Sequence, residues 1–277
     1  MSDDVQYVSQ LLRDLDREKY LVCLYFPEEA RRSVTVLWAF DAEIRRIQDL
    51  VSEPLPGEIR LQWWRDLLQS GANVDAGPLA REMMFTVERH QLPAEVLHSY
   101  LNARIFDLYE DPMPDLGSLE GYLGETVSVI FQMVAFCMGA GRSRTMADAC
   151  GHAGMAIGII RLLRDLAKNN ASGKLFIPLD VLGHAGLDRN LWLHGEVDHR
   201  HTNVLNTMIE LAEKHLEQAN HAIEALPQEF RPVFYQLALV PAYLRQARKR
   251  NLKILREPLT ISPVKSHLLL LKAAMSG

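Results

Sequence analysis

Apolar residues recur at spacings of three and four along almost the whole chain, and runs that alternate apolar with polar residues are scarce. The first spacing places apolar side chains on one face of a helix, whereas a half-buried strand requires alternation. The pattern therefore predicts an all-α fold. We expect helices at 5–22, 28–50, 59–68, 78–90, 93–109, 118–139, 145–168, 202–225, 228–250 and 262–275.

Proline, glycine and asparagine mark the expected breaks between these helices. The clearest breaks are 52–57, Gly71-Ala72-Asn73, 111–115 and 169–173. No linker-like stretch divides the 277 residues, and no unit repeats with a period of about 20 to 50 residues, as a solenoid would require. We expect a single domain over residues 1–277.

Composition excludes several classes of function. The chain has 30 Lys and Arg against 35 Asp and Glu, a net charge of −5, whereas nucleic-acid-binding domains are usually basic. No run approaches the ~18 uninterrupted apolar residues of a membrane span, and the acidic start resembles neither a signal nor a transit peptide. We expect a cytoplasmic protein that binds no nucleic acid and has three buried free thiols, Cys23, Cys137 and Cys150.

The segment 145–168 is unusually rich in small residues, including Gly151, Gly154 and Gly158. A glycine inside a helix costs up to ~1 kcal/mol relative to alanine. Several together indicate either close helix packing or a ligand lying against the backbone, and packing is the favoured interpretation.

Signatures of nucleophilic serine or cysteine, phosphate-binding loops and HExxH metal sites are absent. The histidines also lack metal-ligand spacing: His199 and His201 are neighbours in an expected loop, and His215 and His221 are six residues apart on a predicted helix. We expect all ten histidines to be structural or solvated.

The carboxylates indicate a candidate functional site more strongly than the histidines do. Asp41, Glu43 and Asp49 share one predicted helix, and helical carboxylates on one face can hold a hard cation against a phosphate. Asp41 and Asp49 are eight residues apart with Arg45 midway, so a ladder of ion pairs is the favoured interpretation. Near the C-terminus, six basic residues within 245–256 precede an apolar helix; they indicate a solvated helix end or a docking surface for an anionic membrane or acidic partner.

Two regions of the chain resemble the squalene/phytoene synthase family. The first comprises 26–32 (FPEEARR), 37–40 (LWAF), Asp49 and 60–65 (RLQWWR); the second comprises 158–165 (GIIRLLRD) and 173–178 (GKLFIP). The resemblance implies a single isoprenoid-synthase-like helical bundle around a central cavity. It also implies two acid-rich motifs on facing helices, which hold the Mg²⁺ that stabilises the diphosphate leaving group of a prenyl diphosphate.

The chain departs from the family pattern at the motif positions. The resemblance places the first acid motif on Arg45, Arg46 and Asp49 and the second on Asp165, Lys168 and Asn169. Only two of the six positions remain acidic and three are basic, so we expect no assembly of several Mg²⁺ ions. These six residues and Arg164 are the candidate diphosphate-pocket residues. Asp49 and Asp165 are the metal ligands if there are any, and a shifted set of Asp41, Glu43 and Asp49 is a weaker alternative.

One branch of the family, which resembles the respiratory complex I assembly factors and their bacterial relatives, has such degenerate motifs. The segments 20–24 (YLVCL), 38–44 (WAFDAEI) and 49–53 (DLVSE) resemble that branch. The implied function is non-catalytic assembly or maintenance of a membrane complex like complex I, with its subunits as partners, no cofactor, and peripheral contact with the inner face of the cell membrane.

Two alternatives stay open. The first is an active Mg²⁺-dependent prenyl transferase that condenses farnesyl or geranylgeranyl diphosphate head to head. The second is a metal-independent binder of an anionic isoprenoid or lipid, in which Arg45, Arg46 and Lys168 hold the phosphate.

Overall fold

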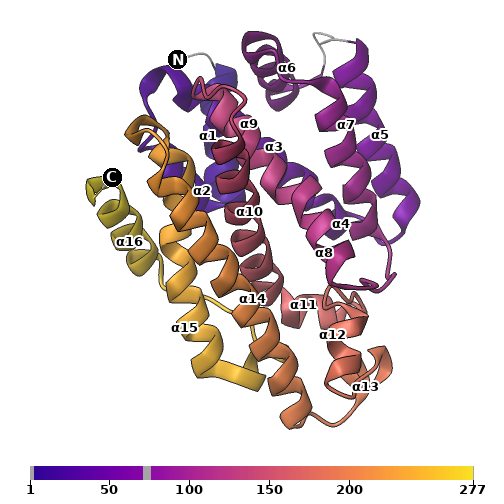
Figure 1. Cartoon of the computed structure of the whole chain (residues 1–277). Helices are drawn as coiled ribbons and strands as arrows, with labels where there is room; N and C mark the ends of the chain where they lie inside the picture. The colour runs from indigo at the N-terminus through magenta and orange to yellow at the C-terminus, as the bar shows by residue number, and fades with distance from the viewer. Residues whose placement is uncertain (1–2, 71–75, 277) are drawn as a thin grey trace.

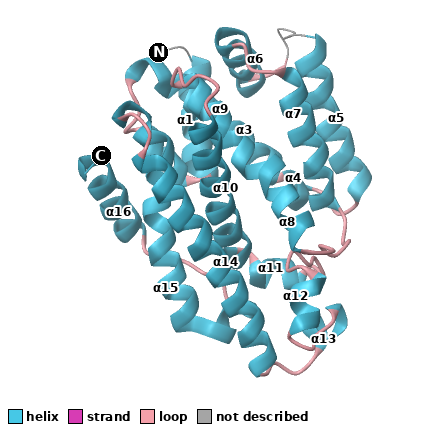
Figure 2. Ribbon diagram, viewed as in Figure 1, coloured by secondary structure: helices cyan, strands magenta, loops and turns pink. Residues whose placement is uncertain are grey.

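The computed structural model describes residues 3–70 and 76–276, which contain helices and loops but no strand (Figure 2). The all-α prediction is therefore confirmed. The first helices are α1 (Asp3–Leu15), α2 (Arg17–Cys23), α3 (Glu28–Arg45), α4 (Ile47–Leu50), α5 (Pro54–Ser70), α6 (Pro78–His90) and α7 (Ala94–Ala103). The middle of the chain forms η1 (Arg104–Leu108), α8 (Leu116–Leu123), the π-helical turn η2 (Gly124–Ser128), α9 (Val129–Cys137) and α10 (Arg144–Arg164). The remainder forms α11 (Leu166–Ala171), α12 (Leu179–His184), α13 (Arg189–His194), α14 (His199–Glu224), η3 (Gln228–Leu239), α15 (Val240–Arg250), η4 (Asn251–Leu255) and α16 (Pro263–Ser276).

The helices form one bundle in which α3 and α10 lie inside (Figure 1). Helix α14 runs beside α10, with α15 and α16 further out, while α5, α6 and α7 form the opposite flank (Figure 1). Apolar side chains cover most faces of α3, and Trp38 meets Phe131 of α9 edge to face at 5.2 Å between ring centroids. A helix buried on most sides places any polar residue it carries deep inside the protein.

The glycines of α10 bring two other elements close to its backbone. A Cβ at Gly154 would lie 2.2 Å from the Ser128 hydroxyl oxygen, and one at Gly158 would lie 2.7 Å from a methyl group of Leu123. Gly151, in contrast, has nothing within 4 Å of that position. Packing against η2 and α8 is therefore the reason for two of the three glycines, and the packing interpretation is confirmed.

Several predicted boundaries are wrong for local reasons. The predicted helix 5–22 breaks at Asp16, because its carboxylate accepts a hydrogen bond from the Lys19 backbone N–H and caps α2. The predicted helix 28–50 breaks at Arg46, between α3 and α4. The break predicted at 52–57 is shorter, since Pro54 and Pro56 lie in the first turn of α5, where a missing N–H leaves no hydrogen bond unmade.

Further corrections concern short or distorted elements. Residues 169–171, predicted as loop, belong to α11, and α12 and α13 were not predicted. Residues 228–239 form the 3₁₀ segment η3 around Pro232 rather than regular helix. The predicted loop at 111–115 is confirmed, and the break predicted at Gly71-Ala72-Asn73 lies outside the described residues.

One described helix, α10, meets the length and composition of a membrane span, but 67% of its most apolar window is buried inside the bundle. Such burial is typical of the core helix of a folded bundle. The thiols of Cys23, Cys137 and Cys150 are buried and free, as predicted, and burial raises the pKa of each to about 12.

Candidate functional site

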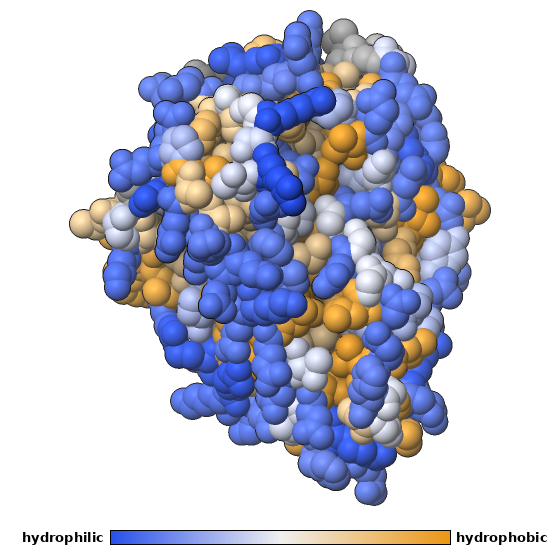
Figure 3. All heavy atoms as spheres, viewed as in Figure 1, coloured by the Kyte–Doolittle hydropathy of each residue, from blue (hydrophilic) through white to orange (hydrophobic). Residues whose placement is uncertain are grey.

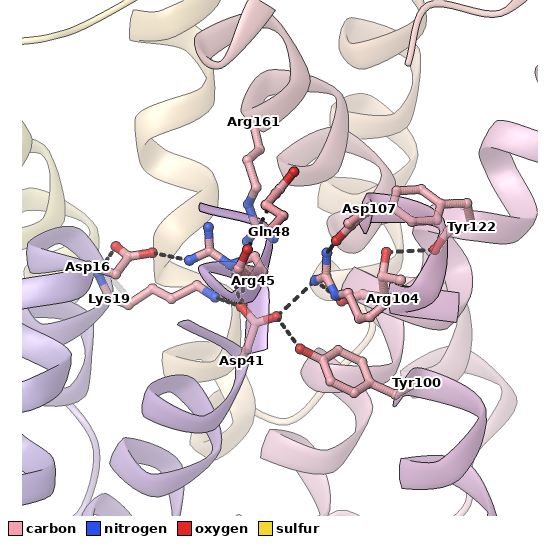
Figure 4. Close-up of polar contacts among 11 residues, drawn as sticks. Asp16, Lys19, Asp41, Arg45, Gln48, Tyr100, Arg104, Asp107, Tyr122 and Arg161 are labelled. Atoms are coloured by element: carbon pink, nitrogen blue, oxygen red, sulfur yellow. Dashed lines mark hydrogen bonds and ion pairs between the residues drawn. The ribbon is translucent and has the colours of Figure 1, made fainter. Parts of the chain in front are cut away.

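A buried carboxylate lies at the centre of the bundle, that of Asp41 in the second half of α3. Lys19 of α2 donates from Nζ to its Oδ2 at 2.6 Å. From the other side, the Tyr100 hydroxyl of α7 and Nη2 of Arg104 each donate to its Oδ1 at 3.0 Å (Figure 4). Segments far apart in the sequence therefore converge on a single anion.

Two more cations complete the surroundings of Asp41. Arg45, one turn further along α3, donates from Nε to Asp41 at 3.2 Å and from Nη2 to Asp16 at 3.1 Å. Arg161 of α10 brings Nη2 to 3.8 Å from Asp41. Burial would raise the pKa of Asp41, but Lys19 and the guanidinium groups outweigh it and hold the pKa well below its usual value. Asp41 is therefore an anion that is fully engaged by its own chain.

Lys19 is the most completely buried of these cations, with its side chain 1% exposed. Its ammonium lies 3.9 Å from the ring centroid of Trp38, in cation–π contact. Burial lowers the pKa of Lys19 to about 7, against the attraction of Asp41. The protonation state of this lysine is therefore sensitive to pH near neutrality.

Arg104 extends the network towards α8. Its Nη1 donates to Asp107 at 3.1 Å, and its Nη2 also donates to the backbone carbonyl of Thr126 at 3.1 Å. The Tyr122 hydroxyl donates to the same Asp107 (Figure 4). In total, four cations meet three carboxylates at the centre: Lys19, Arg45, Arg104 and Arg161 with Asp16, Asp41 and Asp107.

Beside this network is a cavity of about 210 Å³, which collects most of the residues that sequence reasoning selected. Its lining includes Arg45, Arg46, Asp49, Asp165, Lys168 and Asn169. Arg164 instead lines a neighbouring cavity of about 350 Å³ together with Arg45, Arg161 and Asp165. The predicted residues are therefore adjacent in space, around two cavities that share Arg45, Arg161 and Asp165 in their lining.

The basic members of this set are paired within the chain. Lys168 contacts Asp49 at 2.5 Å, and Arg46 contacts Glu43 at 3.5 Å. Arg164 contacts Glu18 at 2.8 Å and stacks over the Tyr243 ring. Together with the pairs of Arg45, these contacts satisfy cations that would otherwise attract an anionic ligand.

The predicted ion-pair ladder along α3 is confirmed for its first pair and wrong for its second. Arg45 contacts Asp41, as an (i, i+4) pair does, but Asp49 lies beyond the end of α3 and pairs with Lys168 of α11 instead. The alternative metal set of Asp41, Glu43 and Asp49 does not converge, because each member faces a different cation.

The donors present do not fit a Mg²⁺ cluster. Among residues 3–70 and 76–276, no group of three or more His, Cys, Asp or Glu side chains is placed to hold a metal ion. Three carboxylates line the smaller cavity, those of Asp49, Asp107 and Asp165. Arg104 already contacts Asp107, and Lys168 already contacts Asp49. Mg²⁺ is a hard cation that needs oxygen ligands not already bound to cations. The described residues therefore offer no cluster of free carboxylates for Mg²⁺.

Two polar atoms at the larger cavity lack a partner. Nη1 of Arg161 and Oε1 of Gln236 are buried and make no hydrogen bond with the described residues, and both side chains line this cavity. Burial and the nearby Arg45 lower the pKa of Arg161 to about 10, so the side chain stays cationic at neutral pH. One positive donor here is therefore unused by the protein.

Sequence reasoning missed the core of the network, namely Lys19, Tyr100, Arg104, Asp107, Tyr122 and Arg161. One signal was available: Arg161 interrupts an apolar run, Ile159-Ile160 before it and Leu162-Leu163 after it. A charge inside a buried helix needs a partner. The identity of that partner was not accessible, because Asp41 lies 120 residues away in the sequence.

Some of the histidines have structural contacts in the described part of the chain. His199 and His201 lie in the first turn of α14, not in a loop as expected, and His201 completes the cap with Asp198. His215 contacts His152 of α10 at 3.0 Å between Nδ1 atoms.

Comparison with known proteins agrees with this architecture. The chain is 29% identical over 255 residues to NADH dehydrogenase (ubiquinone) complex I, assembly factor 6 of Rattus norvegicus, covering 91% of this chain and 76% of that protein. The human protein of the same name is 28% identical over 250 residues, covering 90% and 75%.

Solved structures show the same fold. A dehydrosqualene synthase in complex with ligand superimposes with a TM-score of 0.82 at 14% identity, covering 99% of this chain and 96% of that one. Squalene synthase HpnC from Alicyclobacillus acidocaldarius gives 0.77 at 15% identity, covering 90% and 94%. Residues 12–265 also match the sequence model of squalene/phytoene synthases. The chain belongs to the squalene/phytoene synthase family.

Proposed function

We propose that this protein is a non-catalytic member of the family that acts in the assembly or maintenance of respiratory complex I, with subunits of that complex as its partners. The observation that carries the proposal is the self-contained polar centre. Carboxylates of the chain pair with Arg45, Arg46, Arg164 and Lys168, and among the described residues no group of acids is placed to hold a metal cluster. The relatives named as complex I assembly factors, which match about nine tenths of the chain, support the choice of partner.

The described residues do not supply the metal clamp that the active-transferase alternative requires. Ionising an allylic diphosphate develops concentrated negative charge, which a metal clamp must stabilise. Here Asp49 is engaged by Lys168, and the remaining acid, Asp165, has no second free carboxylate beside it in the described chain. The site therefore supports binding or scaffolding better than ionisation.

Deletion followed by complementation tests the proposed function. We expect deletion of the gene to lower NADH:ubiquinone oxidoreductase activity and the amount of assembled complex on native gels. The double variant Asp49→Ala/Asp165→Ala removes the two acids that remain at the family's motif positions, so it distinguishes an assembly role from metal-dependent catalysis.

We expect this variant to restore complex I as fully as the wild type does, because neither carboxylate supports the core. Normal complex I in the deletion strain would contradict the proposal. So would a folded double variant that fails to restore the complex.

The unpaired Nη1 of Arg161 favours a second function that is compatible with the first: binding of an anionic lipid or prenyl diphosphate without metal. Calorimetric titration of a non-hydrolysable farnesyl diphosphate analogue in EDTA tests it. We expect Arg161→Gln to weaken binding at least about ten-fold, the loss of one charge-assisted contact. Arg144→Gln is the matched control, since this exposed arginine begins the same helix. No binding in EDTA, or equal binding by both variants, would exclude this function.

A further inference from the structure

The outer face of α16 carries an apolar stripe that no described residue covers. Val264, Leu268, Leu271 and Met275 are 70%, 58%, 37% and 81% exposed. They follow one another at spacings of four, three and four, which places them on a single side of the helix. Pale-orange and orange atoms reach the surface at the left edge of Figure 3, where Figure 1 places α16.

The opposite side of α16 fixes its orientation. Leu270 is fully buried, and the Ser266 hydroxyl donates to Glu18 of α2 at 3.1 Å. The Tyr243 hydroxyl of α15 donates to the same carboxylate at 2.6 Å. Because these contacts hold the inner face, the protein cannot hide the stripe by rotating the helix.

Charge on α16 is of one sign. The helix contains Lys265 and Lys272 but no aspartate or glutamate. The lysines are seven residues apart, so both fall along one border of the stripe. Neither has an ion-pair partner within the described chain. The helix thus combines an apolar face with a cationic border, the pattern of a helix that lies in the surface of an anionic bilayer.

A second exposed stripe, on α5, helps to separate membrane contact from ordinary surface. Leu55 and Ile59 are 66% and 61% exposed, about as much as the residues of α16. That helix, however, carries two acids, Glu58 and Asp66, and two bases, Arg60 and Arg65, so its charges cancel. An anionic surface would therefore attract α16 but not α5.

The size of the face argues against a second copy as its occupant. A helix of 14 residues is about 21 Å long and about 10 Å wide, so one side covers on the order of 200 Å². A stable protein interface buries about 800 Å² on each partner. A bilayer has no such requirement, since apolar side chains enter its interface individually while lysines keep their charge in the headgroup region.

We infer that α16 is a membrane-docking helix, which inserts Val264, Leu268, Leu271 and Met275 into the headgroup boundary of an anionic lipid bilayer with Lys265 and Lys272 against the lipid phosphates. The inference is independent of the polar centre and of the proposed function. It places the protein peripherally on a membrane, with η3 and the first turn of α2 directly behind the docking face. The basic residues Arg248 and Arg250 take no part, because Glu213 and Glu257 pair with them.

Flotation of the full-length protein with vesicles tests the inference. The probes are vesicles of phosphatidylcholine alone and of phosphatidylcholine with phosphatidylglycerol, at low and high salt. We expect binding to the anionic vesicles, weakened by salt, and a loss of at least about ten-fold in Leu268→Ser/Met275→Ser. Leu55→Ser/Ile59→Ser is the matched control and should bind as the wild type does. Lys265→Gln/Lys272→Gln should lose most of the preference for anionic lipid.

All substituted side chains are exposed or border solvent, so each variant should keep the wild-type circular dichroism and melting midpoint. Failure of the wild type to float with anionic vesicles would overturn the inference. Equal binding by the two serine variants would overturn it as well. So would light scattering that shows a wild-type dimer converted to monomer by Leu268→Ser/Met275→Ser, since a second copy would then occupy the stripe.

Discussion

Replacing Asp41 with asparagine should be among the most destabilising isosteric changes in this protein. The substitution keeps the shape of the side chain but removes the anion that Lys19, Arg45 and Arg104 contact. One of the two oxygens also becomes an NH₂ group, a donor that faces other donors. The cost therefore comes from the cations that are left behind, not from lost volume.

The structure allows the magnitude to be bounded. Removing one partner of a buried ion pair costs about 3–5 kcal/mol, because the other charge remains buried without compensation. Lys19 can limit its share by releasing a proton, since its pKa is already about 7. Arg104 cannot, because its side chain is 5% exposed and a guanidinium does not deprotonate in proteins. We expect Asp41→Asn to lower the free energy of unfolding by about 3–5 kcal/mol.

Urea unfolding at neutral pH, followed by circular dichroism, measures this change. The matched control is Glu43→Gln, two residues further along α3, whose contact with Arg46 is 3.5 Å long and partly exposed. We expect that change to cost less than about 1 kcal/mol. A cost below about 1 kcal/mol for Asp41→Asn, with an unchanged denaturant slope, would refute the argument that Asp41 holds the centre together.

Three other predictions concern packing, pH and metal. Gly154→Ala should lower the free energy of unfolding by about 1–3 kcal/mol or more, because the new methyl group meets the backbone of η2. Gly151→Ala on the same helix should be neutral or stabilising, since nothing lies within 4 Å of its Cβ position. The urea midpoints of the two variants test this difference. Lys19 has a pKa of about 7 in the folded protein and an ordinary value of 10.5. Between these two pH values the unfolded chain therefore binds more protons than the folded protein does. The free energy of unfolding should therefore rise with pH from about 7, at most about 1.4 kcal/mol per pH unit, and Lys19→Met should flatten that rise in urea titrations. Mg²⁺ should leave the melting temperature of the wild type unchanged in calorimetry; an increase that Asp49→Ala/Asp165→Ala abolishes would contradict our reading of the site.

Helical periodicity was sufficient for the fold class because nearly every long element buries one apolar stripe, and the spacing of that stripe is local information. The breaks were harder to predict. Asp16 ends a helix only because its side chain turns back to the Lys19 N–H, and the π-helical turn before Val129 accompanies the close approach of Gly154 to Ser128. Such features depend on capping and on contacts between elements, which apolar spacing does not record.

The candidate site was predictable only in part for a related reason. The resemblance brought Arg45, Asp49, Asp165 and Lys168 together, and the structure places them around one cavity. Their partners were not predictable, because the sequence does not show whether Lys168 faces a ligand or pairs with Asp49. The carboxylate that organises the centre, Asp41, was predicted only as a member of an ion-pair ladder or of a weaker set of metal ligands.

The central claim is that this fold holds its own cations and no longer performs the chemistry of a prenyl transferase. The most direct test incubates the purified protein with farnesyl or geranylgeranyl diphosphate and Mg²⁺, and follows products and released diphosphate by mass spectrometry. We predict no carbon–carbon coupling product and no diphosphate release above a protein-free control. A coupled product that requires Mg²⁺ and disappears in Asp49→Ala or Asp165→Ala would contradict the claim.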